Sequence, residues 1–175
     1  MISYQTSIAE DLKGIALLHT QSWQYHYRGI LSDEYLDFQI GEERMAVWTK
    51  RFREPKQNQH IITAKEGTTL CGFSCLFDEQ HPQYGTYLDN LHVHVNYQRR
   101  GIGKKLIQLS REWCRQQNPR QGMYLWVFAA NHDAIRFYES VGGQFIETTS
   151  LELMDGSGGY ADTTRFYWEP LSPVS

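Results

Sequence analysis

The chain has 175 residues, 41% hydrophobic and 21% charged, values typical of one globular domain with a single buried core. A formal net charge of -3 argues against a protein whose main task is to coat nucleic acid, and no run of 18 apolar residues indicates a membrane span. Cys71, Cys75 and Cys114 lack the paired spacing of zinc or disulfide sites, so we expect a cytoplasmic protein with no metal, membrane or nucleic-acid partner.

Two helices are predicted in the first third of the chain. Ser7 and Glu10 have the spacing of a capping box, and apolar residues continue along one helical face as far as Trp23. Met45, Trp48 and Phe52 then recur at helical spacing among charged residues. The second helix is expected to end before the proline at position 55.

Strands and two further helices follow. The segments 61–64, 70–77 and 84–95 are predicted to form three antiparallel strands. A helix begins at Gly101, the apolar run 123–128 is typical of a central strand, and Asn131 can cap another helix. Two strands, 144–153 and 163–168, close the chain. The predicted order is ααββββαβαββ, one α/β domain over residues 1–170 with a tail at 171–175.

The segment 91–104 combines an apolar strand, a glycine turn and the start of a helix. Free backbone N–H groups at a helix N-terminus attract anions, and Arg99, Arg100 and Lys104 add positive charge. An ordinary strand-to-helix turn would explain two glycines alone. The dinucleotide pattern GxGxxG fails because Leu106 replaces its last glycine, and the Walker pattern fails on glycine spacing. The segment therefore indicates a phosphate site of another kind.

Gln98, Gly101 and Gly103 match the QxxGxG/A motif of the GCN5-related N-acetyltransferase (GNAT) superfamily. Asn131 and Tyr138, seven residues apart, resemble the second motif of that family. The resemblance spans roughly residues 2–168. It implies a mixed, mostly antiparallel sheet with helices on both faces, and acetyl-CoA as the acetyl donor. It also implies direct transfer to a primary amine, expected to belong to a small molecule, in a ternary complex.

The resemblance also assigns residues to the cofactor. The backbone of Leu91, His92 and Val93 would bind the pantetheine arm, and Asn131 would touch the cofactor. Tyr138 would protonate the departing thiolate, whose conjugate acid has a pKa of about 8.5. The pyrophosphate would be surrounded by the turn residues Gln98, Arg99, Arg100, Gly101, Ile102, Gly103 and Lys104.

The acceptor side is less determined by the sequence. Asp89 is the first candidate to bind the amine and accept its proton, directly or through water, and a solvated strand carboxylate is the alternative. Trp23 and Tyr27 lie in an aromatic segment that would enclose the amine or pack into the core. The glycine-rich segment 154–160 is expected to form the opposite wall.

Several alternatives stay open at this point. His92 and His94 share a strand face but lack a third metal ligand, and no base adjoins a cysteine for a covalent route. A non-catalytic acyl-CoA-binding module and a peptide or protein acetyltransferase are the alternative functions. Trp126 stands where relatives that modify ribosomal-protein N-termini have a glutamate base, which argues against that activity. The acceptor, the general base, the use of other acyl groups and a homodimer remain open.

Overall fold

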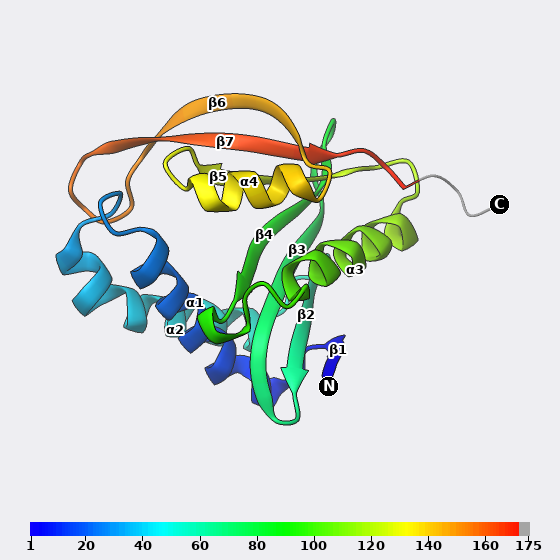
Figure 1. Ribbon diagram of the computed structural model, residues 1–175, viewed down its shortest axis with the longest axis horizontal. Coiled ribbons are helices and arrows are strands. Elements are labelled where there is room, and N and C mark those ends of the chain that lie inside the picture. The colour runs from blue at the N-terminus through cyan, green and yellow to red at the C-terminus, as the bar shows by residue number, and fades with distance from the viewer. Residues whose placement is uncertain (172–175) are drawn as a thin grey trace.

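The computed structural model describes residues 1–171 as a seven-stranded sheet, ordered β1-β2-β3-β4-β5-β7-β6, with two helices on each side (Figure 1). Its strands are β1 (Ile2–Thr6), β2 (Gln59–Glu66), β3 (Thr69–His81), β4 (Gly85–Val93), β5 (Met123–Phe128), β6 (Gln144–Glu152) and β7 (Tyr160–Trp168). The helices are α1 (Leu12–His26), α2 (Ile40–Arg53), α3 (Ile102–Gln117) and α4 (His132–Ser140). Neighbouring strands are antiparallel except β4 and β5, so the mixed sheet is confirmed.

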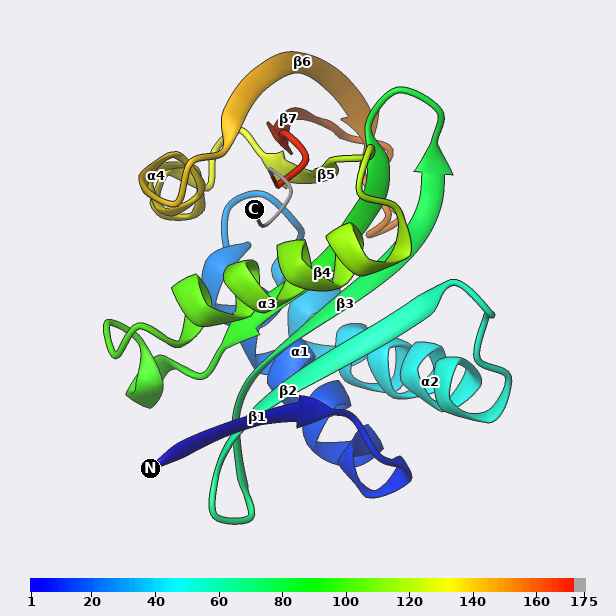
Figure 2. The same cartoon turned by 90° about the vertical axis from the view of Figure 1, so that its right-hand side faces the viewer.

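Each face of the sheet carries its own apolar cluster, because successive side chains of a strand point to opposite faces. Phe73, Cys75 and Phe77 of β3 pack with α1 and α2, around the fully buried Trp48. Leu76 belongs to the cluster on the other face, which α3 and α4 cover. Figure 2 shows α3 crossing one face of β3 and β4 with α1 and α2 behind them. Helices on both faces are thus confirmed.

One strand of the predicted order is misplaced. The observed order is βααβββαβαββ, because β1 precedes the first helix and pairs antiparallel with β2. Ile2 and Tyr4 alternate with polar residues in this five-residue strand at the edge of the sheet. The predicted capping box is also wrong. The carboxylate of Asp11, not the side chain of Ser7, accepts a hydrogen bond at this turn, from the N–H of Ile8 at 3.0 Å.

The parallel pair β4 and β5 separates almost as soon as it forms. Its second and last paired position joins Tyr87 to Tyr124. Beyond it, β4 stays with β3 and β5 stays with β7. A bulge follows in β4, since Leu88 and Asn90 face consecutive residues of β3 and leave Asp89 between them unpaired. The separation opens the middle of the sheet.

No helix within residues 1–171 is both long and apolar enough to cross a membrane. The predicted tail, 171–175, lies outside the described residues except for Leu171.

Candidate active site

A cavity of about 770 Å³ lies where β4 and β5 separate. Its walls come from α1, α2, β4, β5, the start of α3 and α4, so it joins segments far apart in the sequence. Every residue predicted for the site lines it except Arg100. These residues are Trp23, Tyr27, Asp89, Leu91, His92, Val93, Gln98, Arg99, Gly101, Ile102, Gly103, Lys104, Asn131 and Tyr138.

One edge of β4 faces this cavity without a partner strand. Leu91, His92 and Val93 pair with β3 on their other edge. On the β5 side, no described strand pairs with β4 beyond Tyr87. An unpaired strand edge offers backbone N–H and C=O groups for hydrogen bonding. These residues are therefore placed to bind an extended amide-containing chain such as pantetheine.

The glycine turn presents free N–H groups at the start of α3. Gly101 has φ of 79° and ψ of 0°, in the left-handed region that glycine adopts without strain. A Cβ at this position would meet nothing within 4 Å, so the space before it is open. The first helical hydrogen bond runs from the N–H of Lys105 to the carbonyl of Gly101 at 3.0 Å. The N–H groups that precede Lys105 in α3 therefore lack partners within the helix and can bind an anion.

The basic residues of the turn divide into two groups. Arg99 and Lys104 line the cavity, and neither forms an ion pair with another described residue. Arg100 instead donates to Glu66 of β2 at 3.1 Å, and its guanidinium lies 4.9 Å from the ring centre of Tyr97. This arginine lowers the pKa of Glu66. The side chain of Arg100 thus turns away from the place predicted for it.

The glycine at position 103 is required by the packing of two helices. A Cβ there would lie 3.0 Å from Cζ of Phe137, so the glycine allows α3 and α4 to approach each other. Asn131 caps α4, as predicted, by accepting from the N–H of Ala134 at 3.2 Å. Both motif residues therefore hold the two helices of the cofactor end in place.

Tyr138 is 9% exposed and packs against the rings of Phe137, Phe166 and Trp168. Its hydroxyl has no hydrogen-bond partner among residues 1–171, and the residue lines the cavity. Burial raises its pKa, with a further contribution from the nearby phenol of Tyr27. The hydroxyl is therefore protonated at neutral pH, as a proton donor must be.

Asp89 is held by two donors. Nη1 of Arg51 lies 2.7 Å and Nδ2 of Asn90 lies 2.8 Å from the same oxygen, Oδ2. Oδ1 has no partner within the described part of the chain, and the side chain is 20% exposed. Arg51 stacks on Trp48 at 4.9 Å to the ring centre, which fixes its guanidinium. Arg51 was not predicted as a site residue, because the helical spacing of α2 placed it among several charged residues without distinguishing it.

Aromatic side chains form the far wall. The rings of Trp23 and Tyr27 are 5.1 Å apart, and Tyr27 meets Phe128 edge-on at 5.0 Å. Burial raises the pKa of Tyr27 to about 12. Met154 lines the cavity opposite, as expected for the segment 154–160. The aromatic segment thus contributes both to packing and to the cavity wall.

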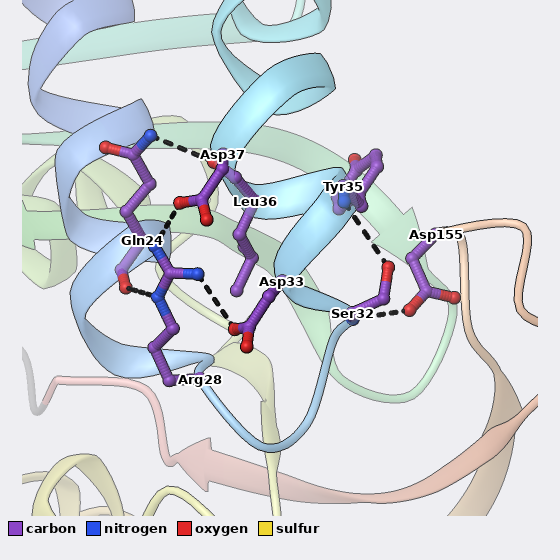
Figure 3. Close-up of polar contacts among 8 residues, drawn as sticks. All are labelled: Gln24, Arg28, Ser32, Asp33, Tyr35, Leu36, Asp37 and Asp155. Carbon is purple, nitrogen blue, oxygen red and sulfur yellow. Dashed lines mark hydrogen bonds and ion pairs between the residues drawn. The ribbon is translucent and has the colours of Figure 1, made fainter.

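A hydrogen-bond network fixes the chain after α1. Arg28 donates to Asp33 at 2.8 Å and pairs with Asp37, and its Nε donates to the carbonyl of Gln24 at 3.2 Å (Figure 3). Asp155, in the loop between β6 and β7, accepts from the N–H of Ser32 at 2.7 Å. The two loops that flank the aromatic end of the cavity are therefore joined to each other.

The side chains of His92, Cys75 and Cys114 are buried and placed for packing. Burial lowers the pKa of His92 to about 3, and its Nδ1 lies 2.8 Å from Oγ of Ser22. Burial raises the pKa of Cys75 and of Cys114 to about 12, so neither is a thiolate at neutral pH. Within residues 1–171, no three histidine, cysteine or acidic side chains gather as metal ligands would.

Comparison with known proteins identifies the family to which the chain belongs. Residues 21–143 match the acetyltransferase (GNAT) family. A probable N-acetyltransferase of Mycobacterium tuberculosis is 28% identical over 167 residues, 94% of this chain and 83% of the relative. The PaiA N-acetyltransferase of Thermoplasma acidophilum, solved with coenzyme A, has a TM-score of 0.72 at 21% identity, covering 96% of this chain and 99% of that one. YncA of Salmonella typhimurium, solved with acetyl-CoA, has a TM-score of 0.69 at 17% identity, covering 99% and 96%. The chain therefore belongs to the acetyltransferase (GNAT) family and is an acetyl-CoA-dependent N-acetyltransferase.

Proposed function

We propose that the chain transfers the acetyl group of acetyl-CoA to the primary amine of a small molecule, by direct attack in a ternary complex. The observation that carries this proposal is a single cavity in which the glycine turn, Tyr138 and an aromatic wall meet. Its size and mixed lining are typical of small-molecule sites. Its aromatic end is walled by two loops that a hydrogen bond from Ser32 to Asp155 joins, and this favours a small acceptor over a protein surface.

In this proposal, the N–H groups at the start of α3 bind the pyrophosphate, with Arg99 and Lys104 beside it. The free edge of β4 at Leu91–Val93 binds the pantetheine arm and so directs the thioester into the cavity. The helix dipole and the full charges act together, because both favour an anion at this end. Arg100 contributes through its backbone rather than its side chain.

The amine nitrogen attacks the thioester carbonyl carbon, and the bond from that carbon to sulfur breaks. The sulfur takes the hydroxyl proton of Tyr138, and solvent later returns a proton to the phenol oxygen. The phenol of Tyr138 is protonated at neutral pH, and its hydroxyl has no competing partner among the described residues, so it can donate as negative charge develops on the sulfur. Once protonated, the sulfur is a poor nucleophile and does not return to the carbonyl carbon, so the transfer to the amine is completed.

Asp89 is the proposed acceptor of the amine's proton, directly or through one water molecule. Arg51 and Asn90 bind Oδ2 and leave Oδ1 for the acceptor. Free alkyl amines have a pKa of about 10.4, so most of the acceptor arrives protonated at neutral pH. A carboxylate at the β4 bulge can first bind the ammonium group and then take its proton.

The test is a coupled measurement of binding and turnover. Acetyl-CoA should raise the melting temperature, and a panel of small amines should include some that release free thiol and form N-acetyl products detected by mass spectrometry. Stabilisation without product from any small amine or peptide would instead identify a non-catalytic acyl-CoA-binding module. Product from peptides alone would contradict the small-molecule acceptor.

A further inference from the structure

The acceptor end of the cavity contains an arginine with unused hydrogen-bond donors. Arg44 of α2 lines the cavity, its side chain is 11% exposed, and its guanidinium lies 4.7 Å from the ring centre of Trp23. Nη2 donates to Glu43. Nε is buried without a partner in residues 1–171, and Nη1 makes no hydrogen bond there either. A buried donor without an acceptor is unfavourable, because it has lost its hydrogen bond to water and gained none in the protein.

A second unused donor lies on the neighbouring helix. His19 is 2% exposed, and its Nδ1 accepts a hydrogen bond from Nε1 of Trp48 at 3.0 Å. Because an indole N–H can only donate, Nδ1 is unprotonated and the neutral ring carries its hydrogen on Nε2. That N–H is buried and has no acceptor within the described chain. The ring of His19 also contacts Trp23, at 5.1 Å, so it lies on the same side of the cavity as Arg44.

The electrostatic surroundings of His19 also favour its neutral form. The positive charges of Arg44 and Arg51 lower its pKa further after burial has lowered it. The carboxylates that line the cavity are already paired, Asp89 with Arg51 and Asp133 with Arg136. The charge of Arg44 is likewise paired, with Glu43. What this end of the cavity offers beyond these pairs is two buried N–H donors without acceptors among the described residues, on side chains that line it, and such donors suit an anionic group.

We propose that the acceptor is a zwitterionic amino acid whose carboxylate is bound by Arg44 and His19 and whose amino group lies at Oδ1 of Asp89. The proposal rests on the proposed function, because it identifies the class of its acceptor. A carboxylate would accept from both unused donors, and hydrogen bonds between charged groups are about twice as strong as neutral ones. The wall of Trp23, Tyr27 and Phe128 favours an apolar side chain on the amino acid.

The test compares L-leucine with L-leucinamide and isoamylamine, which keep the amine and alkyl groups but lack the carboxylate, and with spermidine. Catalytic efficiency is measured for each acceptor, and calorimetry measures binding of leucine and leucinamide to the protein saturated with coenzyme A. Leucine is expected to exceed the other acceptors at least about tenfold in kcat/KM and in affinity. Arg44→Gln should reduce the preference to within about twofold while binding of acetyl-CoA persists.

The matched control is Arg53→Gln, which removes the same charge from an exposed position of α2 and should keep the preference. Equal or better use of leucinamide, isoamylamine or spermidine would overturn the amino-acid acceptor, as would a preference that survives Arg44→Gln. Arg44-dependent binding of leucine without turnover of any amine would support the carboxylate site and overturn the proposed function. The two proposals therefore fail in different measurements.

Discussion

Nη1 of Arg51 in α2 lies 2.7 Å from Oδ2 of Asp89 in β4, at the bulge just beyond the point where β4 and β5 separate. In the chain, strands β2 and β3 lie between the two residues. Both side chains are mostly buried, at 23% and 20% exposure. The pair fixes a carboxylate at the entrance of the opened sheet. A bulge can direct a side chain that a regular ladder would place elsewhere.

Asp89→Asn should lower the acetylation rate most at neutral pH and less at pH 9, where more of the amine is already neutral. The change also leaves Arg51 without its charged partner, so we expect a loss of about 1–3 kcal/mol in unfolding free energy. Arg51→Gln supplies the control, since it should cause a similar loss of stability. A rate loss in Asp89→Asn that is uniform across pH would contradict a role as base.

Gly101→Asp and Gly101→Asn form a matched pair at the phosphate turn. In both variants the backbone at position 101 must keep φ near 79°, so the two variants carry comparable backbone strain. The open space before Gly101 accepts either side chain, but only the aspartate brings negative charge to the pyrophosphate. We expect acetyl-CoA to bind the Asp variant about tenfold more weakly than the Asn variant, measured by calorimetry. Equal affinities would remove this turn from the cofactor site.

Arg99→Ala and Arg100→Ala should differ in their affinity for acetyl-CoA. Arg99 lines the cavity, whereas Arg100 is paired with Glu66. Arg99→Ala should weaken acetyl-CoA binding about tenfold and reduce its dependence on salt, because an exposed charge contact is screened. Arg100→Ala should change affinity by less than about threefold. The reverse ranking, in titrations at two salt concentrations, would show that the Arg100 side chain leaves Glu66 to bind the cofactor.

The stability of the fold should fall with acid through its buried histidines. Burial lowers the pKa of His92 from its ordinary value of 6.5 to about 3. Between these values the unfolded chain binds a proton that the folded chain does not, so the unfolding free energy decreases as pH falls below 6.5. His92→Asn should show a shallower decrease between pH 6.5 and pH 5 in urea unfolding. Identical slopes in both proteins would contradict the buried, neutral state of His92.

The glycine turn and the cap of α4 could be predicted from the sequence because their signals are local. Gly101 and the Asn131 cap act within one helical turn, and the spacing of the motif residues is carried by single helices. The strand β1 was missed because it depends on pairing with β2, about sixty residues away. Arg44 and Arg51 enter the cavity only through the packing of α2 against α1 and the sheet. The residue pattern within α2 does not predict which of its charged side chains this packing will bury.

The most direct test of the account is a single-turnover measurement with Tyr138→Phe. The change keeps the ring that packs on Phe166 and Trp168 and removes only a hydroxyl without a protein partner in residues 1–171. Since general acid catalysis contributes about a hundredfold to ten-thousandfold, the rate of acetyl transfer should fall at least about tenfold. Acetyl-CoA affinity and melting temperature should stay close to wild type. A single-turnover rate equal to that of wild type, with the cofactor bound, would contradict Tyr138 as the proton donor to the leaving sulfur.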